Sequence, residues 1–169
     1  LIHLLDLNKI ELDNSGNIIA ECGALDAQVS RFARNNSRTG LEFLIGIPGS
    51  IGGGIKMNSG AYGNDFENIL IDVKAINKKG KLKTFKKNEL GLGYRKNKLN
   101  DDWIFLSARF KTSQNDRDKI QNKMKEIINN RKISQPTGFK TGGSTFMNGK
   151  NFKAWELIDK AGCRGLKFG

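Results

Sequence analysis

Cysteine, proline and histidine are all scarce in this sequence, which contains two cysteines, two prolines and one histidine. Cys22 and Cys163 stand far apart with no Cys-x-x-Cys spacing, so neither a metal site nor a redox pair is expected. His3 lies close to the first residue and gives no support for histidine-based catalysis or for a histidine metal site. The interpretation that fits best is a cytoplasmic protein with two reduced thiols.

Long hydrophobic runs are also absent. No stretch reaches the roughly 18 apolar residues of a membrane-spanning helix, and the first residues do not form a signal peptide. We therefore expect a soluble protein without a membrane partner. The sequence begins at Leu1 rather than at a methionine and stops at Gly169, directly after a periodic stretch. We interpret it as a piece of a longer polypeptide.

Acidic residues are outnumbered, and the net charge is +12. Between Lys74 and Lys98 there are ten basic residues and a single acidic one, Glu89. A positive field attracts nucleic acid and anionic small molecules alike. Because lysine dominates and no aromatic residues are spaced for base stacking, a solvated face is the favoured interpretation. Help in binding an anionic substrate is second, and nucleic acid is the least favoured partner.

Glycine, by contrast, is abundant and clustered. Seven of the twenty glycines fall within the eighteen residues Gly46–Gly63, which read GIPGSIGGGIKMNSGAYG. Glycine lets a backbone approach a ligand closely but costs roughly 0.5–1 kcal/mol relative to alanine inside a regular element. Such a run predicts that something lies against the backbone. A dinucleotide pyrophosphate, held by successive N–H groups, is the obvious candidate.

The remaining pattern predicts a mixture of strands and helices. Apolar runs predict strands at 18–22, 69–76, 82–85 and 103–110, the last one central, and a hairpin turn at 77–80. Helical periodicity predicts helices from about 24 to 34, from 116 to about 134, and from about 152 to 161. Since there is no regular βαβ alternation, the fold class predicted is α+β rather than a doubly wound sheet.

Four stretches in register resemble one enzyme family. They are Gly46–Gly63, Tyr94-Arg95, the sequence RKISQP at 131–136, and the sequence GSTFMN at 143–148 with WELIDKAGCRG after it. Together they resemble the UDP-N-acetylenolpyruvoylglucosamine reductases, also called UDP-N-acetylmuramate dehydrogenases, of bacterial peptidoglycan synthesis. The order and spacing of these motifs fit across essentially the whole chain, which would correspond to the central portion of the family's longer polypeptide.

The resemblance implies a vanillyl-alcohol-oxidase-like (PCMH-type) FAD-binding fold. Residues 1–112 would form the FAD-binding domain, incomplete at its N-terminus, and residues 113–169 a helix and the start of an α+β substrate-binding domain. It implies FAD as cofactor, NADPH as reductant, and a monomer in the bacterial cytoplasm. The flavin would pass hydride to C3 of the enolpyruvyl ether of UDP-N-acetylenolpyruvoylglucosamine, and a proton delivered to C2 would give UDP-N-acetylmuramate.

The resemblance also assigns residues to roles. Arg95 would stabilise the enolate that hydride addition creates, and Ser144 would donate the proton to C2. Tyr62, Tyr94 and Asn148 would bind the substrate. The residues that would bind FAD are Pro48, Gly49, Ser50, Gly52, Gly53 and Asn58.

The sequence departs from the family pattern at a few positions. Ser59 stands where the family usually has alanine, and Asn97 where it has serine. Met147 and Gly149 flank Asn148 where lysine and proline are common. Two other interpretations stay open: a different flavoprotein of the same FAD-binding class, and an inactive remnant or basic binding module.

Overall fold

The computed structural model describes residues 2–134, 146–149 and 151–166, which fall into two compact units, Leu1–Gln135 and Pro136–Gly169. The sequence placed a domain boundary earlier, between residues 112 and 113. That boundary concerns the domains of the longer protein and stays a prediction. Among the described residues, no helix combines the length and apolar character needed to cross a membrane.

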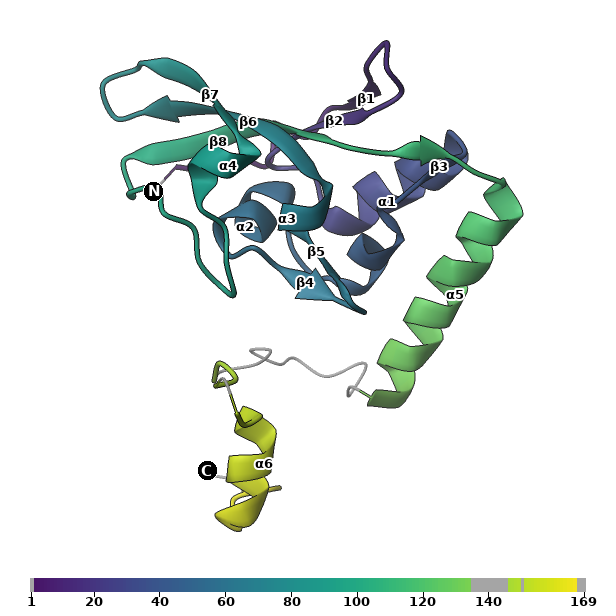
Figure 1. The fold of residues 1–169 in the computed structure, drawn as a ribbon, viewed down its shortest axis with the longest axis vertical. Helices are drawn as coiled ribbons and strands as arrows, with labels where there is room; N and C mark the ends of the chain where they lie inside the picture. The colour runs from purple at the N-terminus through teal and green to yellow at the C-terminus, as the bar shows by residue number, and fades with distance from the viewer. Residues whose placement is uncertain (1, 135–145, 150, 167–169) are drawn as a thin grey trace. The chain divides into compact units, whose positions relative to one another are not determined.

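The centre of the first unit is a five-stranded antiparallel sheet (Figure 1). Its strand order is β1-β2-β8-β6-β7, so β8 lies in the middle, as predicted. β8 pairs with β2 through Ala20↔Ala108 and with β6 through Val73↔Ala108. The strands are β1 (Ile10–Leu12), β2 (Ile18–Glu21), β6 (Leu70–Asn77), β7 (Leu82–Lys86) and β8 (Trp103–Phe110).

Helices cover one face of this sheet and enclose the core (Figure 1). The α-helices α1 (Asp26–Asn35), α2 (Ile51–Lys56) and α3 (Phe66–Ile69) lie there with the 3-10 helix η1 (Glu42–Gly46). Phe66 is fully buried and meets the rings of Phe43 and Phe110 edge-on, with centroids 6.4 and 5.8 Å apart. Edge-to-face aromatic pairs add to the stabilisation that burial provides.

Helix α5 (Arg117–Ser134) also belongs to the first unit. Ile120, Met124 and Ile127 are buried on one face, at the four- and three-residue spacing of a helical stripe. They pack the helix against η1 and α1. This periodicity was readable from the sequence, and the prediction of a helix from 116 to about 134 is confirmed.

Several short elements lack a clear sequence pattern. β1 and α4 (Lys87–Leu90) were not predicted, nor were the two-stranded pairs β3 (Arg38–Thr39) with β9 (Ser113–Gln114) and β4 (Gly60–Ala61) with β5 (Asn64–Asp65). A helix inside the glycine-rich stretch, α2, was not predicted either. Elements this short are made by tertiary contacts rather than by local propensity.

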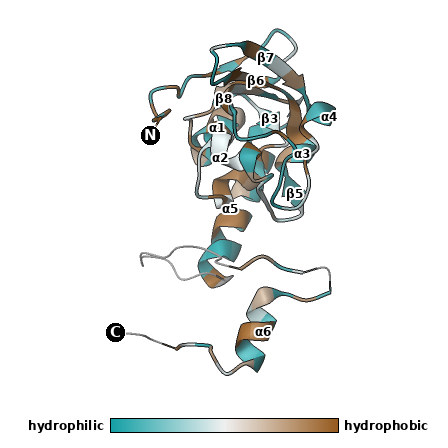
Figure 2. Cartoon of the chain, turned by 90° about the vertical axis from the view of Figure 1, so that its left-hand side faces the viewer, coloured by the Kyte–Doolittle hydropathy of each residue, from teal (hydrophilic) through white to brown (hydrophobic). Residues whose placement is uncertain are grey.

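The second unit contains α6 (Ala154–Lys160), close to the predicted helix. The helix carries both hydrophobic and hydrophilic residues (Figure 2). No residue of α6 is buried, and Trp155 is 57% exposed.

The first unit has an antiparallel sheet with helices segregated to one face. This arrangement confirms the predicted α+β class for the first unit.

Candidate functional site

The glycine-rich segment crosses the end of strand β2 and then enters α2. The N–H groups of Ile51 and Gly52 donate to the carbonyls of Ala24 and Cys22, both at 2.9 Å. Nearby, the Asp26 N–H donates to the Gly49 carbonyl at 3.0 Å. These bonds use the inward groups of the segment and fix its path against the sheet.

The outward side of the same segment is open. Pro48, Gly49 and Gly53 are exposed, while Ser50 and Gly52 are half-buried. The N–H groups of Gly49, Ser50 and Gly53 make no hydrogen bond within the part of the chain that the structure describes. Clustered free backbone donors suit an anionic ligand, so this segment fits the pyrophosphate of FAD.

Two neighbouring glycines of α2 differ in their surroundings. A Cβ at Gly54 would overlap the ring of Phe66, so glycine is required there for close packing onto the core. A Cβ at Gly53 would meet only the Ser50 hydroxyl, at 3.7 Å, which is an ordinary contact. Packing therefore does not explain why residue 53 is glycine. Without a side chain there, no Cβ projects from the exposed side of α2.

Asn58 connects the end of this segment to its neighbours. Asn58 is 4% exposed, and its backbone has a left-handed φ of 40°. The side-chain oxygen accepts from the Glu67 N–H at 2.9 Å, and the amide nitrogen donates to the Gly93 carbonyl at 3.3 Å. The side chain thus holds the Tyr94-Arg95 loop beside α2, whereas its predicted contact with FAD stays a prediction.

Arg95 lies on a loop that is tied to the C-terminal end of α2. Its guanidinium donates to the Asn58 carbonyl at 3.4 Å and lies 5.2 Å from the centre of the Tyr94 ring. The Asn97 side chain donates to the Lys56 carbonyl at 2.7 Å, so the residue that departs from the family serine helps to anchor the loop. Arg95 also has a left-handed φ of 56°. Such backbone strain is frequent at functional sites.

Three of the predicted site residues line one pocket. It has a volume of about 360 Å³, and its wall contains Asn58, Tyr94 and Arg95. Tyr94 is 54% exposed. The other lining residues are Gly60, Ala61, Gly63, Asn64, Asp65 and Glu67.

Tyr62 lines a second pocket, of about 190 Å³, between η1 and α5. Its φ is 55°, and its ring lies against Gly46. Tyr62 and Tyr94 thus line two different pockets that share Asn64, and the assignment of both to the substrate stays a prediction. The other residues of this pocket are Glu42, Phe43, Asn64, Lys123, Glu126, Ile127 and Asn130.

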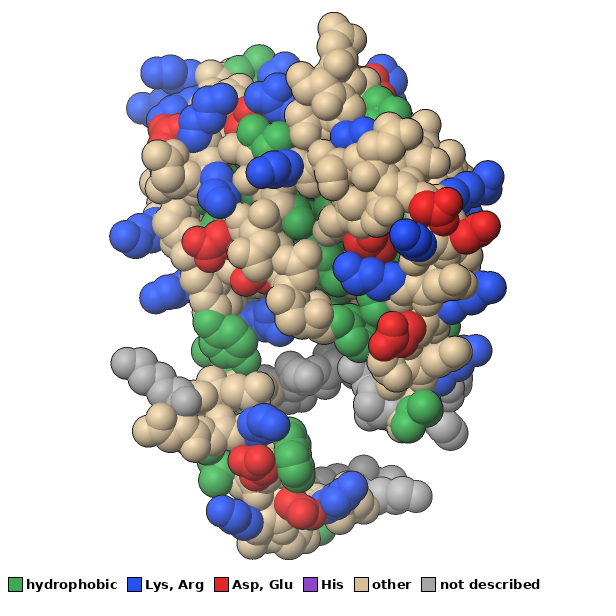
Figure 3. All heavy atoms as spheres, turned by 45° about the vertical axis from the view of Figure 1, so that its right-hand side comes forward, with side chains coloured by type: hydrophobic (Ala, Val, Ile, Leu, Met, Phe, Trp, Pro, Cys, Tyr) green, Lys and Arg blue, Asp and Glu red, His purple; other side chains and the backbone are tan. Residues whose placement is uncertain are grey.

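Three of the ten basic residues of the lysine-rich stretch, Lys78, Lys83 and Lys86, form ion pairs with carboxylates. Lys78 contacts Asp102 at 2.7 Å, and Lys86 contacts Asp72 at 3.3 Å. In Figure 3, the basic side chains of the first unit are spread over the face in view, with acidic and hydrophobic ones between them. This distribution favours the solvated face over a binding patch for nucleic acid.

Asp26 is fully buried beside the glycine-rich segment. Neither of its carboxyl oxygens has a hydrogen-bond partner among the described residues, and one of them lies close to Gly49. Burial raises the pKa of Asp26 to about 7.

In the described ranges, no group of three or more histidine, cysteine, aspartate or glutamate side chains could hold a metal ion.

The second unit contains Asn148, whose side-chain oxygen accepts from the Ala154 N–H at 2.9 Å. Next to it, the Gly149 N–H donates to the Phe152 carbonyl at 3.1 Å, a bond that the proline common in the family could not make. Met147 is 65% exposed. Ser144, the predicted proton donor, lies outside the described residues.

Comparison with known proteins agrees with the geometry. A family model described as "FAD binding domain" matches residues 1–86. The chain belongs to the FAD binding domain family. The PCMH-type FAD-binding fold expected from the sequence is confirmed.

Individual relatives are more specific. The chain is 47% identical over 165 residues to the UDP-N-acetylenolpyruvoylglucosamine reductase of Rickettsia prowazekii, covering 97% of this chain and 55% of the relative. It is 46% identical over 156 residues to the enzyme of the same name from Anaplasma marginale, covering 92% and 52%. The resemblance predicted from the four motifs is therefore confirmed. The chain spans about half the length of these curated relatives.

A solved structure carries the same resemblance. The crystal structure of UDP-N-acetylenolpyruvylglucosamine reductase from Thermus caldophilus aligns with a TM-score of 0.81 at 32% identity. The alignment covers 89% of this chain and 56% of that one. The arrangement of strands and helices is thus shared with that enzyme.

Two residues at the site were missed by sequence reasoning. Asp26 looks like an ordinary first-turn acid of a helix, and only tertiary packing buries it. Arg131 belongs to the RKISQP motif that supported the resemblance, so the motif was a usable signal, but it received no role. Its guanidinium donates to the Gly46 carbonyl at 2.9 Å.

Proposed function

We propose that the full-length protein containing this chain is an FAD-dependent reductase that converts UDP-N-acetylenolpyruvoylglucosamine to UDP-N-acetylmuramate with NADPH as reductant. The observation that carries the proposal is the pocket in which Arg95, Tyr94 and Asn58 meet directly after the exposed glycine-rich segment. A pocket that contains the Arg95 guanidinium next to a cofactor segment offers a cation to a substrate whose carboxylate gains charge during reduction.

Pro48, Gly49, Ser50, Gly52 and Gly53 would hold FAD, with Asn58 at the end of the same segment. When bound, FAD supplies the hydride that reaches C3 of the enolpyruvyl group. The support from the structure is the open side of this segment and the free N–H donors of Gly49, Ser50 and Gly53.

Arg95 would stabilise the negative charge that develops on the substrate carboxylate. Its guanidinium is half-buried and oriented by the Asn58 carbonyl and the Tyr94 ring, so part of the cost of positioning it is met before substrate binds. Ser144 would donate the proton to C2. Tyr62, Tyr94 and Asn148 would contact the UDP-sugar.

The proposal includes a cellular setting and a domain division. The protein would act as a monomer in the bacterial cytoplasm, on a small-molecule partner and without a nucleic-acid or membrane partner. Residues 1–112 would form part of the FAD-binding domain and residues 113–169 the start of the substrate-binding domain. Two alternatives are a flavoprotein of the same class with another substrate and an inactive remnant or basic binding module.

The test separates cofactor binding, flavin reduction and substrate reduction. Purified full-length protein is expected to be yellow with bound FAD and to oxidise NADPH only when the enolpyruvyl nucleotide is present. In anaerobic stopped-flow experiments, Arg95→Met is expected to slow flavin reoxidation by substrate about 100- to 1,000-fold, the usual effect of losing one preorganised donor. Flavin reduction by NADPH should change little.

Matched variants sharpen this result. Lys96→Met removes an adjacent exposed cation and should leave both half-reactions intact. Ser144→Ala should keep flavin reduction and block substrate reduction. An undiminished rate of reoxidation in Ser144→Ala would exclude Ser144 as proton donor. A colourless protein that never binds FAD would favour the binding-module alternative.

A further inference from the structure

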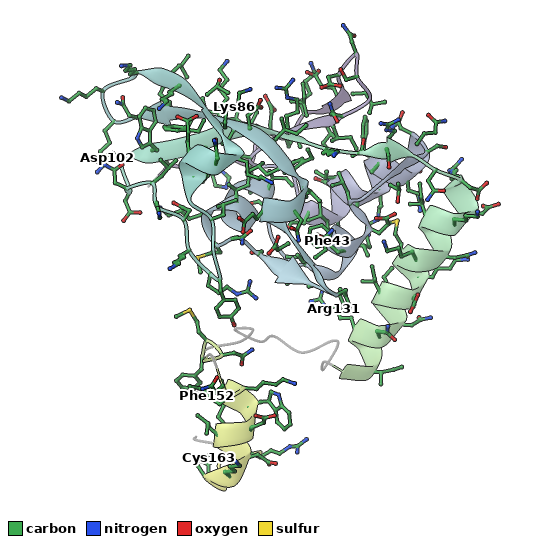
Figure 4. The ribbon with its side chains drawn as sticks, viewed as in Figure 1. Phe43, Lys86, Asp102, Arg131, Phe152 and Cys163 are labelled. Carbon is green, nitrogen blue, oxygen red and sulfur yellow. The ribbon has the colours of Figure 1, made fainter. Side chains whose placement is uncertain are left out.

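A side chain of α5 reaches the first residue of the glycine-rich segment. Figure 4 labels Arg131 on α5. Its guanidinium donates through Nη1 to the Gly46 carbonyl at 2.9 Å. The two residues are far apart in sequence, and the side chain that joins them is half-buried. A hydrogen bond with one charged partner is stronger than a neutral one, and more so when partly removed from water.

Gly46 is enclosed by side chains as well. An added Cβ would lie 2.5 Å from Cε2 of Tyr62 and 3.0 Å from Cγ2 of Ile127. Tyr62 follows β4, and Ile127 belongs to α5 one turn before Arg131. The position of Gly46 is therefore fixed by a ring, an aliphatic side chain and a charged hydrogen bond at once.

Fixing Gly46 has a consequence for the residues that follow it. Gly46 ends η1, and Ile47 and Pro48 lead directly into the open side of the segment. Proline has a locked φ, so few dihedral angles remain between Gly46 and Gly49. The Gly46 peptide therefore helps to set the direction in which the chain enters the open side of the segment, and the Asp26 N–H holds the segment again at the Gly49 carbonyl.

Helix α5 is attached to η1 at a second place. Lys123 lies 3.7 Å from the Glu42 carboxylate, which also accepts the Gly40 N–H at 2.9 Å and the Thr39 hydroxyl. Two basic side chains of one helix face thus contact the two ends of η1. Helix α5 therefore holds η1 at both ends, directly before the glycine-rich segment begins its exposed part.

We propose that Arg131 is a positioning residue that orients the Pro48–Gly53 backbone for FAD through its hydrogen bond to the Gly46 carbonyl. The inference rests on the proposed binding of FAD by this segment. It deepens that proposal, because it assigns part of the geometry of the cofactor site to a residue of α5 that does not itself belong to the segment.

A simpler role would be compensation of the helix dipole. Basic residues in the last turn of a helix are favourable, and both Arg131 and Lys132 occupy the last turn of α5. If this were the whole role, removing either charge would have the same effect. Lys132 is exposed and therefore provides a matched control on the same turn.

The experiment compares Arg131→Met, Arg131→Lys and Lys132→Met in the full-length protein. Arg131→Met is expected to raise the Kd for FAD about tenfold, the effect of losing one charge-assisted hydrogen bond, and to shift the visible absorption band of the bound flavin. Arg131→Lys should restore much of the affinity, because an ammonium can still donate to the carbonyl. Lys132→Met should match the wild type in both measurements.

Thermal unfolding of each apoprotein separates positioning from loss of fold. A raised Kd with a nearly unchanged midpoint supports the proposal. An unchanged Kd and spectrum in Arg131→Met, with the wild type binding FAD, overturns it while leaving the proposed function intact. Equal effects of Arg131→Met and Lys132→Met also overturn it, in favour of the helix dipole. If the wild type binds no FAD, the proposed function itself fails.

Discussion

Asp26 shows how a single residue can make stability depend on pH. Its carboxyl group is fully buried without a hydrogen-bond partner among the described residues, and burial raises its pKa from 3.8 to about 7. The folded state therefore binds this proton more tightly than the unfolded chain does. The resulting stabilisation is fully present below about pH 4 and is lost as the pH rises through about 7.

We expect Asp26→Asn to remove this loss of folding stability at high pH. The neutral amide has nearly the same shape and carries no charge to desolvate, so the variant should be more stable than wild type at pH 8 by up to about 4 kcal/mol. At pH 4.5 the two proteins should differ little. Urea unfolding of the apoprotein between pH 4.5 and 8.5 measures the effect, with Asp6→Asn as an exposed control. Parallel pH profiles for wild type and Asp26→Asn would contradict the prediction.

Helix α2 has two glycines with opposite reasons for being glycine. Gly54 faces the core, where a methyl group would overlap the ring of Phe66. Gly53 faces outward and has room for a methyl group. The difference predicts that alanine substitutions at these neighbouring positions will separate stability from cofactor binding.

Gly54→Ala is expected to destabilise the apoprotein by about 1–3 kcal/mol, the usual cost of overpacking. Gly53→Ala should leave stability unchanged or raise it by up to about 1 kcal/mol, because alanine favours helix. It should weaken FAD binding, since the methyl group would project from the proposed cofactor face. Urea unfolding and FAD titration of both variants provide the comparison. Unchanged FAD affinity in Gly53→Ala would place the cofactor elsewhere.

The buried apolar residues of the described chain all belong to the first compact unit. They extend from Ile18 to Ile127, while α6 buries none of its residues. Since burial of apolar surface supplies most of the stabilisation, the first unit should fold without the second. We therefore predict that a fragment of residues 1–135 unfolds cooperatively.

The fragment is expected to have a midpoint within a few degrees of that of the 169-residue chain. Circular dichroism during heating measures both, and the helix signal of α5 should be retained. A midpoint lower by more than about 10 °C, or a gradual transition, would show that residues after 135 stabilise the first unit. Loss of α6 alone should lower only the total helix signal.

Long periodic segments were predictable from the sequence. The strands β6 and β8 and the helix α5 carry their pattern in residues such as Val73, Ala108 and Met124, because alternation and 3.6-residue spacing depend only on neighbours in the chain. Shorter elements such as β4, β5 and α4 were not predictable, since two to four residues are too few to show a period. The helix predicted from about residue 24 begins at Asp26, and Leu25, which precedes it, is 46% exposed.

The sequence by itself determined the family, the α+β class and the glycine-rich segment, because motif spacing and periodicity are properties of the chain order. Only the tertiary structure decided which groups meet. It brought Asn58, Tyr94 and Arg95 to one pocket, moved Tyr62 to another, buried Asp26 and joined Arg131 to Gly46. Such contacts join residues that are far apart in the sequence, and they form only when helices and strands pack together. A local sequence pattern does not contain this information.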